Sequence, residues 1–162
     1  MILEIYTLFH VLISLAGIIA GFLVMCGMLA GKRLDWCSAV FLTATLATSV
    51  TGFFFPVQHF MPSHAVGLIS LAMLAVAIYA RYPRQIKGGW SKVYVIAAML
   101  GQYLNVFVLI VQLFMKVPAL KELAPTQTEP PFKITQLVVL IFFVLFTVVA
   151  AIRFRPEPIH AA

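Results

Sequence analysis

Charged side chains are scarce in this sequence: only 10% of its 162 residues are Asp, Glu, Lys or Arg, whereas 63% are hydrophobic. A soluble domain carries about 25% charged and about 45–50% apolar residues, so this chain has more apolar surface than one small core could bury. The composition excludes a soluble enzyme, a nucleic-acid-binding module and a disordered tail. It predicts a single polytopic membrane domain over residues 1–162, with the lipid bilayer as its main partner and no nucleic acid.

Cysteine and several functional motifs are also scarce or missing. The two cysteines, Cys26 and Cys37, are eleven residues apart, which excludes a disulfide framework and a CxxC redox motif. The sequence has neither a phosphate-cradling glycine loop nor an HExxH zinc motif. No Lys, Arg, Asp or Glu lies in the middle of an apolar segment, so a carboxylate proton relay, a retinal Schiff base and a voltage sensor all lack their required groups.

Long apolar segments dominate what is present. A membrane-spanning helix needs about 20 mostly apolar residues, and five segments qualify, at about 5–29, 36–55, 64–82, 93–115 and 134–152. The first segment is preceded by Glu4 and not by the basic residues of a secretory signal peptide, and its apolar stretch is longer than that of such a signal. We therefore expect a transmembrane helix that is retained in the mature protein. The predicted fold is an all-α integral membrane protein, a bundle of five transmembrane helices.

The basic residues predict the orientation of this bundle, because cytoplasmic loops carry an excess of Lys and Arg. Eight of them share one side: Lys32, Arg33, Arg81, Arg84, Lys87, Lys92, Arg153 and Arg155. The other side has Lys116, Lys121 and Lys133, which three glutamates balance. We therefore expect the N-terminus outside and the C-terminus in the cytoplasm of a bacterium, with the chain in the cytoplasmic (inner) membrane.

One long connection, residues 116–133, carries four prolines and is expected outside. Its first part could form one or two helical turns, and the stretch from Ala124 should be extended. It is interpreted either as a semi-rigid flap over the outer mouth of the bundle or as a plain connector.

Histidine supplies the main candidate ligands. His10 lies roughly 8 Å into the first segment, and Ser14, Gly17 and Gly21 follow on the same helical face, so we expect His10 to face protein. His64 opens the third segment on the same side of the membrane. Two imidazoles from different helices are the arrangement by which helical bundles hold a haem iron, so His10 and His64 are candidate ligands of one haem b. Structural roles for both histidines remain the alternative.

The turn before the third segment offers a second candidate site. His59, Met61 and His64 put two imidazoles and a thioether within six residues, a ligand set suited to copper. A metal-handling protein or a small-solute carrier is the corresponding function.

Amide side chains form the last candidate set. Asn105 and Gln112 share a face of the fourth segment with small residues, and Gln136 lies near the outer start of the fifth. They are interpreted either as interhelical hydrogen bonds or as the lining of a polar pocket beside the histidines, where a quinone carbonyl could bind. The second segment adds several Thr and Ser hydroxyls. They are interpreted either as further lining of that pocket or as hydrogen bonds to the backbone of their own helix.

These patterns together predict a small integral membrane subunit or accessory protein of a membrane redox system, binding one b-type haem or a quinone at its outer side. The alternative is a non-catalytic interaction or assembly protein. Its small-residue stripe (Gly17, Gly21, Gly27 and Gly31) would pack against another membrane subunit or a second copy.

Overall fold

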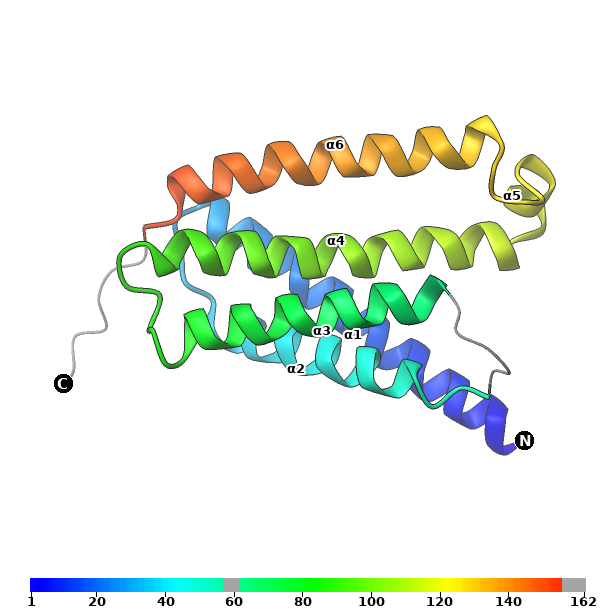
Figure 1. The fold of residues 1–162 in the computed structure, drawn as a ribbon, viewed down its shortest axis with the longest axis horizontal. Helices are drawn as coiled ribbons and strands as arrows, with labels where there is room; N and C mark the ends of the chain where they lie inside the picture. The colour runs from blue at the N-terminus through cyan, green and yellow to red at the C-terminus, as the bar shows by residue number, and fades with distance from the viewer. Residues whose placement is uncertain (57–61, 156–162) are drawn as a thin grey trace.

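The structure is a computed structural model that describes residues 1–56 and 62–155. All regular elements in this part of the chain are helices: α1 (Ile2–Leu29), α2 (Asp35–Gly52), α3 (Pro62–Arg81), α4 (Trp90–Lys116), α5 (Pro118–Leu123) and α6 (Pro130–Arg153) (Figure 1). The predicted all-helical fold is confirmed. The helices begin up to four residues before the predicted segments, because polar or proline residues are tolerated in a first turn, as with Pro130 and Pro131.

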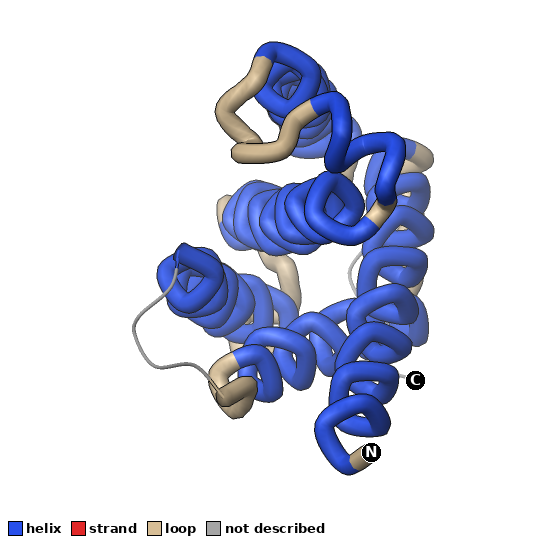
Figure 2. Tube along the Cα trace, turned by 90° about the vertical axis from the view of Figure 1, so that its right-hand side faces the viewer, coloured by secondary structure: helices blue, strands red, loops and turns tan. Residues whose placement is uncertain are grey.

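The five long helices alternate in direction between the two ends of the bundle; α3, α4 and α6 are nearly parallel, and α1 crosses behind them at an angle (Figure 1). α1 packs along α2, α3 along α4, and α6 mainly along α4, with α2 against α3 and α1 against α4 completing the bundle. α6 lies at the edge of the bundle beside α4 when the molecule is viewed from the end that carries α5 (Figure 2). We call the end at which α1 begins the pocket end, and the opposite end the basic end, because all eight basic residues predicted to share a side fall there.

Four helical stretches of the described chain are long and apolar enough to cross a membrane: Ile2–Leu29, His64–Arg81, Trp90–Lys116 and Pro130–Arg153. The protein therefore has the features of a multi-pass membrane protein. α2 is not in this set, since it is rich in hydroxyl side chains and begins at Asp35. The fifth span and the orientation remain predictions.

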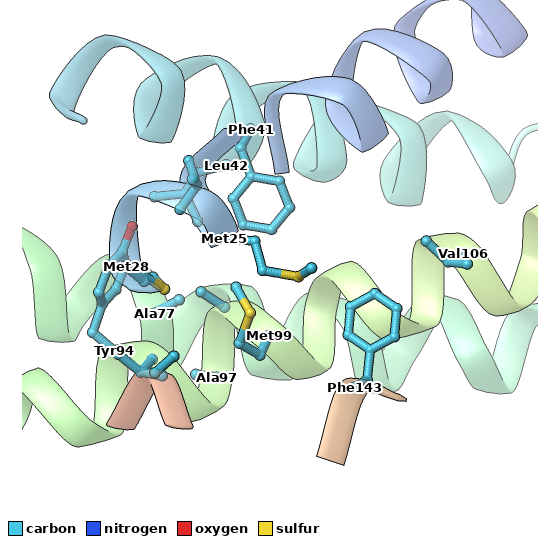
Figure 3. Close-up of a cluster of buried hydrophobic side chains, with 14 of the residues drawn as sticks. Met25, Met28, Phe41, Leu42, Ala77, Tyr94, Ala97, Met99, Val106 and Phe143 are labelled. Carbon is cyan, nitrogen blue, oxygen red and sulfur yellow. The ribbon is translucent and has the colours of Figure 1, made fainter. Parts of the chain in front are cut away.

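The buried core continues along α4 as far as Phe114, but most of its fully buried side chains lie in the basic half of the bundle. Met25 and Met28 of α1, Phe41 of α2, and Tyr94 and Met99 of α4 meet there and are almost fully buried (Figure 3). The first three turns of α1, in contrast, contain no buried residue. Helices packed tightly at one end and loosely at the other leave room for a pocket at the loose end.

A buried arginine connects three helices at the basic end. Arg81, which is 3% exposed, forms an ion pair with Asp35 at the start of α2, and its guanidinium lies 3.3 Å from the hydroxyl of Tyr94 on α4. Arg33 donates to the same carboxylate oxygen at 2.8 Å. The ion pair and this hydrogen bond offset part of the cost of burying the guanidinium.

The connection between α4 and α6 contains the helical turns expected of it, as α5. The expectation of an extended stretch from Ala124 is wrong, because the chain turns there and Pro130 and Pro131 already begin α6. Gln127 attaches the following segment to α4 by donating to the carbonyl oxygen of Val111 at 3.1 Å. The hydroxyl of Thr126 donates to Glu129 at 2.8 Å and so holds the pKa of that exposed carboxyl below its ordinary value. No residue of the connection beyond Lys116 lines the pocket described below.

Candidate functional site

A cavity of about 620 Å³ lies at the pocket end among α1, α2, α3 and α4. Its wall is mostly apolar, with a few polar side chains from every one of these helices. The polar or ionisable residues that line it are Thr7, His10, Ser14, Thr48, Ser49, His64, Ser70, Asn105, Gln112 and Lys116. Among its described lining residues none is Asp or Glu, so the ionisable groups around it are two imidazoles and one ammonium.

His10 is held on the wall of this cavity by α2. Its Nδ1 lies 2.8 Å from the hydroxyl oxygen of Thr51. That hydroxyl donates to the carbonyl oxygen of Ala47 at 2.7 Å, so its remaining lone pairs accept a hydrogen bond from Nδ1–H. The Nε2 atom of the neutral imidazole then carries a lone pair that can accept a proton donor or bind a metal. The ring edge of His10 also meets Phe55, with ring centroids 5.1 Å apart.

The small-residue face predicted for α1 is present and turns His10 toward α2. A Cβ at Gly17 would lie 3.3 Å from the Cβ of Ala44, which shows how closely α2 approaches α1. One turn further, a Cβ at Gly21 would lie 2.0 Å from Oε1 of Gln102, so only glycine leaves room for this amide. The expectation that His10 faces protein is confirmed by this packing.

Hydroxyl groups of α2 bond to three neighbouring helices. Ser14 of α1 donates to Thr48 at 3.3 Å and Ser49 donates to Ser70 of α3 at 3.2 Å. Thr45 accepts from Nδ2 of Asn105 on α4 at 2.9 Å. Bonding back to the backbone, one of the two expectations for these hydroxyls, describes Thr51 but not Thr45 or Ser49. The cavity thus has a hydrogen-bonded frame between its helices.

The three amides named from the sequence have different positions. Asn105 and Gln112 line the cavity. Gln136 is not among its lining residues: its Nε2 donates to the carbonyl oxygen of Phe107 at 3.2 Å, between α6 and α4. Its helix lies on the far side of α4, and that position separates Gln136 from the histidines. Gln102 similarly bonds between helices, donating to the carbonyl oxygen of Ile18 at 2.9 Å.

His64 lies on the α3 side of the same cavity, stacked on Phe53 with ring centroids 5.5 Å apart. The structure therefore brings the two candidate haem ligands, His10 and His64, to one cavity. His59 and Met61 of the candidate copper site lie outside the described residues. Within residues 1–56 and 62–155, no group of three His, Cys, Asp or Glu side chains could hold a metal ion.

The roles of two residues were not predicted from the sequence. Thr51 was among the hydroxyls expected to join the pocket or to bond their own backbone, but its contact with His10 had no signal in the sequence. Lys116 lines the cavity from the last turn of α4. In the sequence, Lys116 lies just after the predicted end of the fourth segment, and it was used only to predict orientation.

Comparisons with known proteins add no family to this description. No protein-family model, no curated protein and no solved structure matches the chain.

Proposed function

We propose that this protein is a small subunit or accessory protein of a bacterial inner-membrane redox system, and that it binds the head group of a quinone in the pocket. The observation that carries this proposal is the lining of the cavity: an apolar space of about 620 Å³ with a few converging hydrogen-bonding groups and no carboxylate among its described lining residues. Sites for small lipophilic ligands typically have about 300–1,000 Å³ and this kind of lining.

The proposed topology has five spanning helices, with the pocket end outside. Three of the hydroxyl groups that lower the hydropathy of α2, those of Thr45, Thr48 and Ser49, have partners on α4, α1 and α3, so α2 need not expose these three to lipid. The basic end carries eight Lys and Arg residues, which favours the cytoplasmic side. In this orientation the pocket opens near the outer surface of the membrane.

A quinone ring fits the chemistry of the lining. Its carbonyl oxygens accept hydrogen bonds, and Asn105, Gln112 and Lys116 supply N–H donors from one helix. The reduced form carries hydroxyl groups, which can donate to the Nε2 lone pair of His10. The apolar residues of the wall, such as Leu15, Val108 and Leu109, would cover the ring and the start of its tail.

The proposal is tested by calorimetric titration of a decyl-substituted benzoquinone into the protein in mild detergent. Decylbenzene, which has the same tail and ring but no carbonyl oxygen, is the matched control ligand. We expect saturable binding of about one quinone per chain and no saturable binding of decylbenzene. Equal, unsaturable uptake of both compounds would contradict the proposal, because it would show partitioning into the detergent micelle.

One haem b is the second candidate ligand of the same pocket, favoured by the shared position of His10 and His64 on its wall. In this case the Nε2 atom of His10 would bind the iron. The Nδ1–H of the same ring would donate to Thr51, and metal-bound imidazoles commonly donate their second ring N–H in this way. The test is a reduced-minus-oxidised absorption spectrum of the purified protein. A b-type signal near one per chain, lost in His10→Ala and in His64→Ala with folding intact, would support haem; a colourless protein would exclude it.

A further inference from the structure

A second cavity, of about 470 Å³, lies at the basic end between α4 and α6. It is bordered by the turn between α3 and α4, by the first residues of α4, and by the last residues of α6 and those that follow. Two cationic side chains, Lys92 and Arg155, line it together with apolar residues that include Ile86, Ile152 and Phe154. It is thus separate from the quinone pocket, which lies at the other end of the bundle.

The two cations have no carboxylate partner among the described residues. Asp35, the one described acidic residue at the basic end, already forms ion pairs with Arg33 and Arg81. The other described acids, Glu4, Glu122 and Glu129, belong to the pocket end. The described part of the chain therefore leaves Lys92 and Arg155 without a neutralising carboxylate, at the ends of two helices long and apolar enough to cross a membrane.

The backbone and neighbouring side chains keep the cavity in shape. Ser91 donates to the carbonyl oxygen of Phe154 at 3.0 Å, which fixes the end of α6 against the start of α4. Ile86 is 2% exposed although its φ is 58°, a left-handed conformation that is costly for a β-branched residue. The backbone N–H of Ile86 donates to the carbonyl oxygen of Ala80 at 2.9 Å and so caps the end of α3. The residues that directly precede Lys92 and Arg155 are thus bonded to each other.

An apolar strip leads away from this cavity along the outer face of α6. Ile152 borders the cavity and is 64% exposed; Val148 and Leu145, one and two turns back, are 54% and 63% exposed. Residues three and four apart lie on one helical face, so these side chains form a continuous surface along the direction of the bilayer normal. A hydrocarbon chain can lie on this strip while its head group occupies the cavity.

We propose that this cavity binds the phosphate of an anionic phospholipid, with Lys92 and Arg155 on the phosphate and an acyl chain along Ile152, Val148 and Leu145. Basic pockets between membrane helices on the cytoplasmic side are suited to such head groups. The apolar strip distinguishes the lipid from a free phosphate ion, which would use the two cations alone. This site is independent of any ligand in the quinone pocket.

The test is native mass spectrometry of the full-length protein in mild detergent, titrated with phosphatidylglycerol. Phosphatidylcholine, which carries a phosphate but no net charge, is the matched control lipid. The variant Lys92→Gln/Arg155→Gln removes both cations, and Lys121→Gln/Lys133→Gln makes the same charge change at the pocket end. All four side chains are exposed, so none of these changes disturbs the core.

We expect phosphatidylglycerol to bind about 30-fold more weakly to Lys92→Gln/Arg155→Gln than to the wild type, which corresponds to about 2 kcal/mol for two basic side chains. Lys121→Gln/Lys133→Gln should bind as the wild type does. Unchanged binding to the first variant, or equal binding of phosphatidylcholine, would overturn the proposal. Complete displacement of the lipid by millimolar inorganic phosphate would also overturn it, by assigning the site to the free ion.

Discussion

His10 and Thr51 lie 2.8 Å apart between imidazole Nδ1 and hydroxyl oxygen, and they join an early turn of α1 to the last turns of α2. The same threonine accepts a hydrogen bond from Tyr6 at its carbonyl oxygen, 2.6 Å away. Two side chains of α1 are thus held by one residue of α2. In the neutral imidazole, this contact leaves the lone pair on Nε2 of His10.

Replacing Thr51 by valine should weaken quinone binding without removing any group that touches the quinone. The Nδ1–H of His10 would lose its acceptor, and one such hydrogen bond contributes about 0.5–1.5 kcal/mol, so we expect a loss of about two- to twelvefold in affinity. Thr51→Ser keeps the hydroxyl and should restore binding. Nitrogen NMR of the imidazole should show Nδ1 protonated in the wild type. Equal affinities of Thr51→Val and Thr51→Ser would argue against a positioning role.

Gly21→Ala should destabilise the protein, because the new Cβ would lie 2.0 Å from Oε1 of Gln102. The amide would have to leave the carbonyl oxygen of Ile18, and overpacking of this kind costs about 1–3 kcal/mol. Gly101→Ala is the matched control, since a Cβ there meets nothing within 4 Å. It should be neutral or stabilising by up to about 1 kcal/mol. Thermal unfolding in one detergent compares the two; equal losses would contradict the packing.

The apolar periodicity was enough to predict helices and the face of α1 that carries His10, Gly17 and Gly21, because small residues at helical spacing are typical of a close contact between two membrane helices. It could not predict the partners of α2. Thr45, Thr51 and Ser49 look alike in sequence, yet each bonds a different helix. Which helices are neighbours depends on packing of the whole bundle, and hydropathy contains no such information.

Gln136 illustrates the same limit. Because Gln136 lies near the outer end of an apolar segment, it was predicted to line the pocket. The depth of a residue in the membrane, however, does not tell which neighbouring helix its side chain faces. α6 packs mainly on α4, which puts this amide opposite Phe107 and away from the cavity. The opposite error concerns Arg81. In the sequence this residue was used only to predict the orientation of the bundle, but the structure buries it almost fully between helices.

Asp35→Asn should lower stability by leaving Arg81 without its carboxylate. Removing one partner of a fully buried ion pair costs about 3–5 kcal/mol. Asp35 is itself 68% exposed, so water replaces part of the lost interaction, and we expect about 1–2 kcal/mol. Glu122→Gln, at an exposed acid of α5, is the matched control and should have no effect. A loss in both variants, measured by thermal unfolding, would attribute the change to net charge alone.

The proposed orientation predicts which loops can be labelled from outside the cell. With Cys26 and Cys37 replaced by serine, Lys121→Cys and Lys87→Cys place one exposed thiol at each end of the bundle. A membrane-impermeant maleimide should label Lys121→Cys on intact cells and Lys87→Cys only after lysis. The reverse pattern would invert the orientation, and labelling of both on intact cells would contradict a membrane crossing by α4.

The most direct test of the account is quinone binding to Gln112→Leu and Gln136→Leu, measured by calorimetry in the same detergent. Both substitutions remove one amide near the pocket end of the bundle, but only Gln112 lines the cavity. Gln112 is exposed, so its hydrogen bond to the quinone contributes about 0.5–1.5 kcal/mol, and we expect affinity to fall by about two- to twelvefold in Gln112→Leu and to stay unchanged in Gln136→Leu. Equal affinity in wild type and Gln112→Leu, or a loss confined to Gln136→Leu, would contradict a quinone site in this pocket.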